Sequence, residues 1–321
     1  MTKRRIVVLL LIIVSIMALV PACARKDAKS EQIVYIAWSN RQDSYSFIST
    51  LRTVEAAGAK PVVLEQALSD DLHYDKKGEL TDADEDEHGI LTPQAAKKVK
   101  VNTWQNSNVE TIMKGVDCVI FPGGSDICPS LYYHEQRWHG ITDDTDYSSE
   151  RDVSDYILLS YCLEHDIPVL AICRGMQMLA VITDGTIVQD FSLYYNERGQ
   201  TYDNMHRQPP SENQDYAVHD VAVTSADSIF RRIVGADALS RVPSWHHQGV
   251  LQTEKSRFVT TGYTVTGGIP LVEAMEVPGK KFALGVQFHP EIVVSGNPEG
   301  KEKEFFDYDT AMRFFEAIAG K

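Results

Sequence analysis

The chain has 321 residues, enough for one large or two small domains with a substantial core. Its composition is ordinary for a globular protein, with 43% hydrophobic and 24% charged residues and a formal charge of -14. Contacts to phosphates need clustered lysine and arginine, and this sequence clusters them only at residues 3–5, which argues against nucleic acid as a partner.

The first 22 residues have the pattern of an export signal. Three basic residues at 3–5 precede an apolar run over residues 6–20 that only Ser15 interrupts. This run is short for a membrane span, which needs about 20 residues, and it is typical of a secretory signal. Ala22 directly before Cys23 resembles a bacterial lipobox, which implies cleavage before Cys23 and lipidation of its thiol. A plain secretory signal and an uncleaved anchor are the alternatives.

The polar residues 23–31 then form a tether between the lipid and a folded domain at 32–320. We therefore expect an exported lipoprotein of the cell membrane, on its periplasmic or outer face. A homodimer is an open option for its assembly.

The elements of the domain alternate between strands and helices. Residues 33–38, 45–58 and 61–64 read as strand, helix and strand, a βαβ unit that predicts parallel pairing. Residues 216–223 alternate apolar and polar side chains, as an antiparallel strand does. We also expect helices at 109–115, 149–165, 176–182, 229–234 and 305–319, strands at 117–121, 167–172, 258–263, 270–276 and 281–286, and a short strand and loop at 188–195.

The segment 68–106 is rich in aspartate and glutamate and has almost no apolar pattern. Its Asp82-x-Asp84-x-Asp86 run invites a calcium-loop reading, but an EF-hand needs glycine at the sixth position and glutamate at the twelfth. Glu87 and Pro93 occupy those positions. We therefore expect a solvated acidic insertion at the surface.

Cysteine usage favours neither a disulfide framework nor a zinc finger. Five cysteines occur, an odd number, and no pair has the spacing of a zinc finger. Cys118 and Cys162 lie among apolar residues and are expected to be buried as small hydrophobes.

Cys173 lies where an apolar strand turns into a helix. The strand residues 167–172 lead directly into Cys173-Arg174-Gly175 and the helix that follows. A side chain at such a turn projects into a cleft, and the helix dipole favours its thiolate form. The serine version of this placement is a known way to present a nucleophile.

A nucleophilic cysteine needs a base, and the base needs an orienting group. Of the ten histidines, His289 directly follows a predicted strand and precedes Pro290, and Glu291 lies two residues on. A carboxylate at that place can hold the imidazole ring. Gly123-Gly124 at another strand end could point backbone amides into the cleft, although Pro-Gly-Gly alone indicates only a tight turn.

The combined motifs resemble the class I glutamine amidotransferase superfamily, and best its γ-glutamyl hydrolase branch, the relatives of γ-glutamyl-γ-aminobutyrate hydrolase. They occur in the family's order and extend over roughly residues 32–320. The matching pieces are Phe-Pro-Gly-Gly-Ser-Asp-Ile-Cys-Pro-Ser-Leu-Tyr at 121–132, Arg-Asp at 151–152, Ile-Pro-Val-Leu-Ala-Ile-Cys-Arg-Gly-Met-Gln at 167–177, Asp-Gly-Thr-Ile-Val-Gln-Asp at 184–190, Ser-Trp-His-His-Gln at 244–248 and Val-Gln-Phe-His-Pro-Glu at 286–291.

The resemblance implies a single α/β domain with a central, mostly parallel sheet flanked by helices, layered as in flavodoxin. It implies a triad of Cys173, His289 and Glu291 that hydrolyses a γ-glutamyl amide through a thioester and releases glutamate. Backbone amides of Gly124 and Arg174 would stabilise the oxyanion. Neither a metal nor an organic cofactor is needed, and the small γ-glutamyl substrate is the expected partner.

The resemblance also points to residues outside the triad. The resemblance places Gln177, His246 and His247 near the substrate, although a structural role for the two histidines is as well supported. His206 lies in a polar loop and is expected at the surface. Two other functions stay open: a non-catalytic lipoprotein that binds ligands on the same fold, and a glutaminase subunit that feeds ammonia to a synthase.

Overall fold

The computed structural model describes residues 32–134, 136–137, 139, 146–203, 205–207, 216–296 and 304–320. The chain divides into two units, Met1–Ser30 and Glu31–Lys321, and the second contains every element named below. Cys23 and the predicted signal and tether lie outside the described residues. Within the described part of the chain, no helix is both long and apolar enough to cross a membrane.

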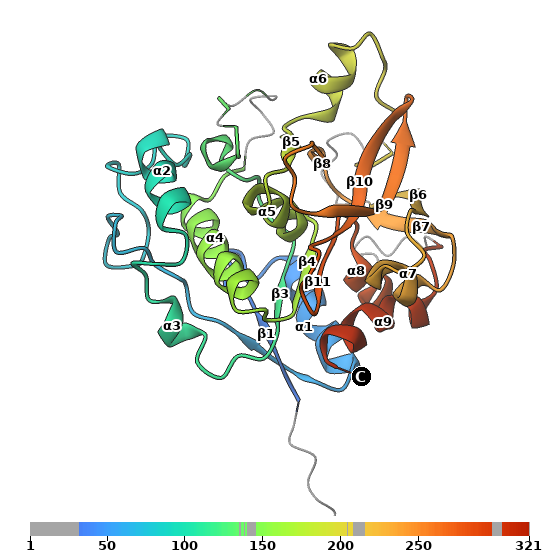
Figure 1. Ribbon diagram of the computed structural model, residues 1–321, viewed down its shortest axis with the longest axis horizontal. Helices are drawn as coiled ribbons and strands as arrows, with labels where there is room; N and C mark the ends of the chain where they lie inside the picture. The colour runs from blue at the N-terminus through green and yellow to red at the C-terminus, as the bar shows by residue number, and fades with distance from the viewer. Residues whose placement is uncertain are drawn as a thin grey trace, which may run out of the picture. The chain divides into compact units, whose positions relative to one another are not determined.

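The domain alternates strands with helices along most of its length (Figure 1). The strands are β1 Ile33–Ile36, β2 Lys60–Val63, β3 Val119–Phe121, β4 Val169–Ile172, β5 Thr186–Val188, β6 Ala217–Val223, β7 Ala238–Ser244, β8 Gly249–Leu251, β9 Val259–Thr266, β10 Ile269–Glu276 and β11 Ala283–Val286. The helices are α1 Tyr45–Ala56, α2 Pro93–Asn102, α3 Val109–Ile112, the 3-10 turn η1 Pro129–Leu131, α4 Ser149–Glu164, α5 Arg174–Ile182, α6 Phe191–Asn196, α7 Ile229–Val234, α8 Pro290–Ser295 and α9 Tyr308–Ile318.

One mixed sheet runs through the domain in the order β2-β1-β3-β4-β11-β10-β9-β6-β7. The strands from β2 to β11 pair in parallel, as the βαβ pattern predicted. From β11 onward to β7 all pairs are antiparallel, and the alternating pattern of residues 216–223 correctly predicted β6. The carboxyl ends of β3, β4 and β11 therefore meet at one edge, where ligand sites of parallel sheets form.

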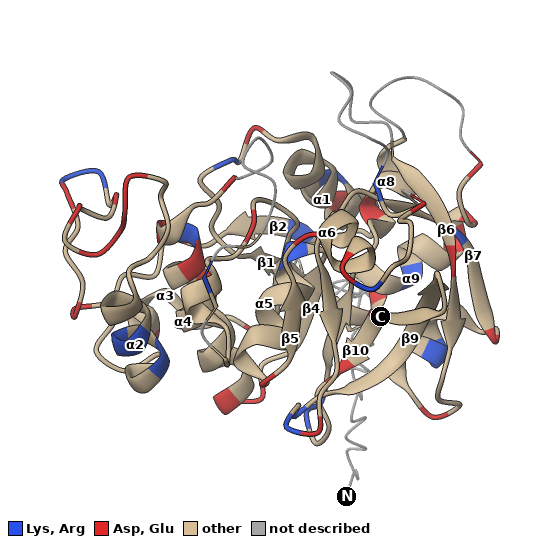
Figure 2. Ribbon diagram, turned by 90° about the horizontal axis from the view of Figure 1, so that it is seen from above, with Lys and Arg blue, Asp and Glu red and all other residues tan. Residues whose placement is uncertain are grey.

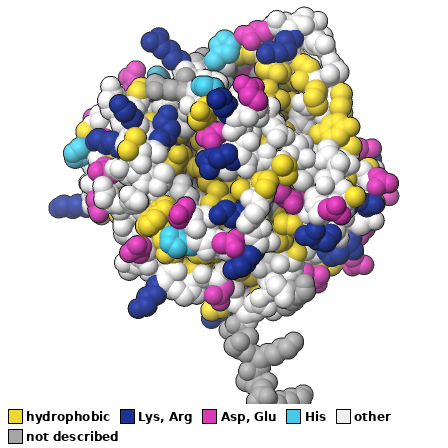
Figure 3. Space-filling model, viewed as in Figure 1, with side chains coloured by type: hydrophobic (Ala, Val, Ile, Leu, Met, Phe, Trp, Pro, Cys, Tyr) yellow, Lys and Arg dark blue, Asp and Glu magenta, His cyan; other side chains and the backbone are white. Residues whose placement is uncertain are grey.

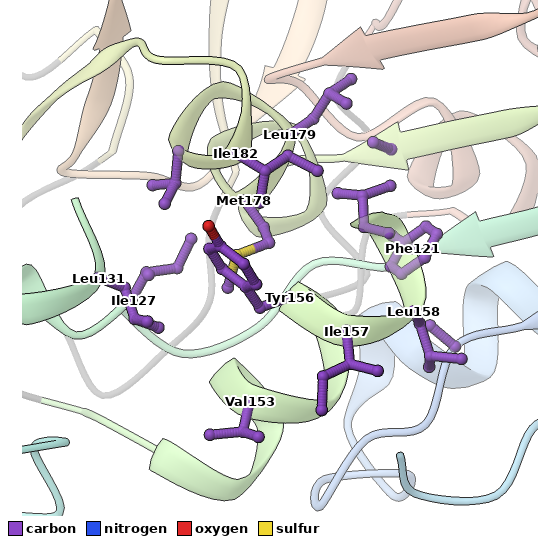
Figure 4. Packing of buried hydrophobic residues seen from close by; sticks show 14 of the residues in the cluster. Phe121, Ile127, Leu131, Val153, Tyr156, Ile157, Leu158, Met178, Leu179 and Ile182 are labelled. Atoms are coloured by element: carbon purple, nitrogen blue, oxygen red, sulfur yellow. The ribbon is translucent and has the colours of Figure 1, made fainter. Parts of the chain in front are cut away.

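Helices cover both faces of the parallel strands because successive strand side chains point to opposite sides. Val119 and Val169 join a core with α2, α4 and α5, whereas Ile120 and Leu170 join a second core with α1, α7 and α9. Side chains of α4 and α5 interlock in the first core, with Tyr156 beside Met178 (Figure 4). This packing fixes α5, and hence its first turn, against the sheet.

The acidic segment 68–106 is better packed than its composition predicted. It contains α2, and Leu72, Leu80 and Leu91 are buried in the first core. Asp84 is also buried, 3.8 Å from the Lys98 ammonium. The expectation of a solvated insertion was therefore wrong for its apolar residues, which are too far apart to form a helical or strand period.

Charged residues of both signs nevertheless lie side by side on α2 and its neighbouring loops (Figure 2). The face shown in Figure 3 also mixes acidic and basic side chains, without a large region of one sign.

The expectation of a short strand and loop at 188–195 was also wrong. The strand β5 ends at Val188, and residues from Phe191 onward form α6. The Asp190 carboxylate accepts a hydrogen bond from the Leu193 amide at 2.8 Å and caps this helix. The cap outweighs the strand preference of its aromatic residues.

Cys118, Cys128 and Cys162 are free and buried, which confirms the expectation for Cys118 and Cys162. Burial raises the pKa of Cys118 to about 11 and raises the pKa values of Cys128 and Cys162 above the usual range of a thiol. These three thiols are therefore unreactive and serve as apolar side chains of the core.

The packing of α2 can be tested with two valines of the same helix. Val99 is 1% exposed and Val101 is 71% exposed. We expect Val99→Ala to lower the free energy of unfolding by about 2 kcal/mol, because it removes buried methyl groups and leaves a void. Val101→Ala should change it by less than about 0.5 kcal/mol. Urea titration measures both, and equal effects would mean that α2 does not pack on the domain.

Candidate active site

Cys173 sits at a sharp turn between β4 and α5, with φ 52° and ψ -107°. A positive φ is unfavourable for a residue with a side chain and persists only where the surroundings hold it. Here the Cys173 amide donates to the Val286 carbonyl at 2.8 Å, and its carbonyl accepts from the Gln177 amide at 3.1 Å. The turn also needs Gly175, since a Cβ there would lie 2.3 Å from the Phe121 carbonyl oxygen.

His289 follows β11 and immediately precedes α8, which starts at Pro290. Its Nδ1 lies 2.7 Å from Glu291 Oε1, and the Ser46 hydroxyl donates to the same oxygen at 2.7 Å. The His289 amide donates to the Pro243 carbonyl at 2.9 Å. The ring is therefore fixed from both its backbone and its Nδ1, which leaves Nε2 as the reactive nitrogen.

Gly123 shows how closely Cys173 and His289 approach each other. A Cβ on Gly123 would lie 3.0 Å from His289 Cε1 and 3.6 Å from Cys173 Cβ. The glycine thus leaves the space that both side chains occupy, at the end of β3. The three residues that the sequence predicted as a triad are brought together from β4, β11 and the start of α8.

The electrostatics of this group favour a charged imidazole. Burial opposes protonation, but the Glu291 carboxylate and the Cys173 sulfur outweigh it and raise the pKa of His289 to about 10. Such an imidazolium beside a cysteine is the partner that stabilises a thiolate at neutral pH.

A buried ion network lies beneath the turn. The Arg174 guanidinium pairs with Asp152 and Asp155 of α4, and Arg151 Nε lies 3.5 Å from Asp155 Oδ2. Arg151 also donates to the Pro122 carbonyl at 2.9 Å. All four side chains are buried, so two positive and two negative charges compensate one another.

The network also explains Gly124, one of the two predicted oxyanion residues. A Cβ on Gly124 would lie 1.8 Å from Arg151 Nη1, so only glycine fits beside the guanidinium. Arg174, the other one, is the first residue of α5, where backbone amides have no partner within the helix. Burial would lower the pKa of Arg174, but Asp155 and Asp152 raise it above its usual value.

Two adjoining cavities open at Cys173. The first, of about 140 Å³, is lined by Ser46, Gly123, His289 and aromatic residues including Tyr45 and Tyr216. The second, of about 150 Å³, is lined by Asp126, Gln177, Arg207, His246 and His247. Both share Gly124, Asp146, Cys173 and Trp245. A larger cavity of about 530 Å³, beside Trp104 and Arg257, has no lining residue in common with these two.

Gln177, His246 and His247 thus all line the second cavity with Cys173. His247 Nε2 lies 3.2 Å from Asp126, and its Nδ1 lies 3.4 Å from Asp190. Burial opposes its protonation, but these two carboxylates raise the pKa of His247 to about 9. The motifs contain Asp126 and Asp190, but nothing in the sequence indicates that both carboxylates approach the ring of His247.

His206 is not at the surface, and this expectation was wrong. Its side chain is fully buried beside His219, His246 and Glu273. Burial lowers the pKa of His206 well below 6.5 and that of His219 to about 4. The surrounding loop is polar, so its sequence gives no signal of burial.

Comparisons with known proteins show the family of the chain. The family model for peptidase C26 matches residues 94–291, more than half of the chain. The γ-glutamyl-γ-aminobutyrate hydrolase PuuD of Escherichia coli K12 is 30% identical over 191 residues, 58% of this chain and 68% of that protein. Protein NtpR of Enterococcus hirae is 30% identical over 193 residues, 60% of this chain and 73% of its own length.

Another relative is matched over less of its length. A putative glutamine amidotransferase of Mycobacterium tuberculosis is 31% identical over 184 residues, 57% of this chain and about half (53%) of that protein. Among solved structures, the glutaminase domain of Trypanosoma brucei CTPS with bound acivicin superposes with a TM-score of 0.50 at 16% identity. It covers 91% of this chain and 94% of that domain, which supports the fold.

The fold and these matches define a hydrolase of the class I glutamine amidotransferase-like type. Within that class, the chain belongs to the peptidase C26 family.

The buried network can be tested through Asp155, which contacts both arginines. We expect Asp155→Asn to lower the free energy of unfolding by about 3–5 kcal/mol, because it leaves a buried positive charge uncompensated. Asp184→Asn is the matched control: it breaks the pair with Arg257, whose side chain is 63% exposed, and should change stability by less than about 1 kcal/mol. Similar effects of the two substitutions on urea unfolding would contradict a structural role of the network.

Proposed function

We propose that the protein hydrolyses a γ-glutamyl amide bond with Cys173 as the nucleophile. The observation that carries this proposal is the placement of Cys173 and His289 together beside Gly123, with Glu291 hydrogen-bonded to Nδ1 of His289. A buried thiol, a base and an orienting carboxylate beside one cavity are the components of cysteine acyl transfer. The resemblance of this chain to γ-glutamyl-γ-aminobutyrate hydrolases supports the choice of substrate class.

In the first half of the proposed reaction, Cys173 Sγ attacks the δ-carbonyl carbon of the γ-glutamyl group. His289 takes or already holds the thiol proton. The tetrahedral oxyanion accepts hydrogen bonds from the amides of Gly124 and Arg174, each worth about 3–4 kcal/mol in comparable sites. The C–N bond then breaks, and His289 Nε2 gives its proton to the leaving amine.

In the second half, water attacks the thioester. His289 accepts a proton from the water, the C–S bond breaks, and glutamate and the free thiol are released. The balance is one water consumed for each amide bond broken.

The two cavities suggest where the two parts of the substrate bind. A γ-glutamyl group carries an α-ammonium and an α-carboxylate, and Asp126 and Arg207 line the second cavity but not the first. The charged residues of the first cavity, Arg41 and Asp146, are paired with each other at 2.6 Å, and its tyrosine and tryptophan rings suit the leaving amine. We therefore assign the glutamyl part to the second cavity.

Turnover of a γ-glutamyl panel, starting with L-γ-glutamyl-p-nitroanilide, tests the proposal. We expect release of glutamate and the amine by the wild type and none by Cys173→Ala. Tight binding without turnover would favour a ligand-binding protein instead. Ammonia release that appears only with an added synthase would favour a glutaminase subunit.

The triad geometry predicts a graded effect of its supporting residues on kcat/KM. We expect Glu291→Gln to lower kcat/KM at least about 100-fold, because the His289 ring loses its orienting carboxylate. Ser46→Ala removes only one hydrogen bond to Glu291 and should cost about tenfold or less. Glu197→Gln disrupts an exposed pair with His139 and serves as the control with unchanged kcat/KM. Wild-type kcat/KM in Glu291→Gln would exclude the assigned role.

We further propose export and lipid anchoring through Cys23, on the strength of the basic start, the apolar run and the Ala22-Cys23 junction. The proposed location is the outer or periplasmic side of the cell membrane.

Expression in a bacterial host with labelled fatty acid tests the anchor. We expect the wild-type chain to incorporate label and to sediment with membranes, and Cys23→Ala to lose the label. Cys118→Ala, a buried thiol, is the control that keeps it. Unlabelled wild-type protein would rule the anchor out.

A further inference from the structure

A second cluster of side chains that can ligate a metal ion lies outside the triad. It comprises His206, His219 of β6, His246 between β7 and β8, and Glu273 of β10. All four are buried, and one nitrogen or oxygen atom of each lies within 4.8 Å of the others. Four elements distant in sequence therefore converge on one small space.

The outward ring nitrogens of two of these histidines fix their tautomers. His246 Nδ1 lies 2.7 Å from the Gln248 carbonyl, and His219 Nδ1 lies 3.3 Å from the Asp220 carbonyl. A carbonyl oxygen only accepts hydrogen bonds, so each Nδ1 carries the hydrogen. A neutral ring then has a lone pair on Nε2.

His206 follows the same logic through Thr266. The Thr266 hydroxyl donates to Met205 Sδ at 2.8 Å, and its oxygen is 3.4 Å from His206 Nε2. Because that hydroxyl hydrogen is already used, Nε2 of His206 is the donor and Nδ1 has the lone pair.

All three lone pairs face the Glu273 carboxylate. His206 Nδ1 and His246 Nε2 lie 3.4 and 3.9 Å from Oε1, and His219 Nε2 lies 3.6 Å from Oε2. Among the described residues, neither carboxylate oxygen has a hydrogen-bond donor, and the same holds for His206 Nδ1 and His246 Nε2. The Ser244 hydroxyl, 3.1 Å from His219 Nε2, is a single donor beside four acceptor groups.

A buried set of acceptors that face one another is stabilised by a cation or a hydrogen-bond donor between them. We propose that His206, His219, His246 and Glu273 bind one zinc ion. Three imidazole nitrogens and one carboxylate oxygen are ligands that zinc prefers, and four protein ligands make a closed, structural site. The hydrogen bonds of the outward ring nitrogens are the usual support of histidine ligands.

The dimensions suit a tetrahedral ion after a small contraction. Bonds of about 2.1 Å place tetrahedral ligand atoms about 3.4 Å apart. His206 Nδ1 and His246 Nε2 lie at 3.4 and 3.9 Å from Glu273 Oε1, close to this value. His219 Nε2 lies 3.6 Å from the other oxygen, Oε2, so the carboxylate would turn to present one oxygen to the ion. A protonated Glu273 would also remove the buried charge, but its single hydrogen could serve only one of the facing nitrogens.

The position of the cluster gives the ion a structural role beside the active site. His246 lines the second cavity and directly precedes His247 in the chain. The carbonyl of Glu273 accepts from the Gln287 amide at 2.9 Å, two residues before His289. Zinc would therefore hold together the segment that carries His247 and the strand next to His289.

Metal analysis of the full chain, purified without a histidine tag from zinc-supplied cells, tests the proposal. We expect about one zinc per chain by inductively coupled plasma mass spectrometry. Removal of zinc with 1,10-phenanthroline should lower Tm by at least about 5 °C, and added ZnCl2 should restore it. Cobalt introduced in place of zinc should give the strong visible absorption of a tetrahedral site.

Glu273→Gln is the variant of choice, because its amide can donate to the facing nitrogens and keep the domain folded without metal. Its zinc content should fall at least tenfold. His139→Gln removes an exposed histidine 2.8 Å from Glu197 and should keep the zinc.

Three results would overturn the site: wild-type protein with less than about 0.1 zinc per chain and no response of Tm to ZnCl2, cobalt without a tetrahedral spectrum, or equal zinc in Glu273→Gln. The wild-type measurements decide the matter even if the variant fails to fold.

Discussion

The buried ion pairs between α4 and α5 are the interaction on which the rest of the site depends. Arg174 begins α5 directly after Cys173, and its guanidinium is held by Asp152 and Asp155. Arg151, in the same network, binds the carbonyl of Pro122 at the end of β3. One charge-balanced group thus positions both Cys173 and the glycine loop at 123–124. Such pairs add little net stability, but removing one partner is costly, so the geometry is fixed.

The second wall of the site depends on the antiparallel half of the sheet. His289 follows β11, while His246 and His247 follow β7. The cluster around Glu273 lies behind these segments and joins β6, β10 and the loop with His206. The proposed triad and the proposed metal site therefore lie close together but use different side chains. Ion pairs hold one wall, and in our proposal zinc holds the other.

The sequence predicts those parts of the structure that follow local patterns. Short apolar runs mark β3, β4 and β11, but the meeting of Gly123, Cys173 and His289 depends on the order of these strands in the sheet, which no local pattern reveals. The burial of Leu72 and Leu80 depends on packing into the first core, and no period in the sequence reveals it. His206 is similar, because a histidine in a polar loop gives no sign of the rings it meets. The helix α6 depended on one capping carboxylate, Asp190, against the strand preference of its aromatic residues.

The central claim is that Cys173 carries the glutamyl group during turnover. Rapid acid quenching of the wild-type chain with a γ-glutamyl anilide, followed by peptide mass spectrometry, tests it most directly. The account predicts a glutamyl adduct on the peptide that contains Cys173, and neither adduct nor turnover in Cys173→Ala. Undiminished turnover in Cys173→Ala, or an adduct on another residue, would contradict it.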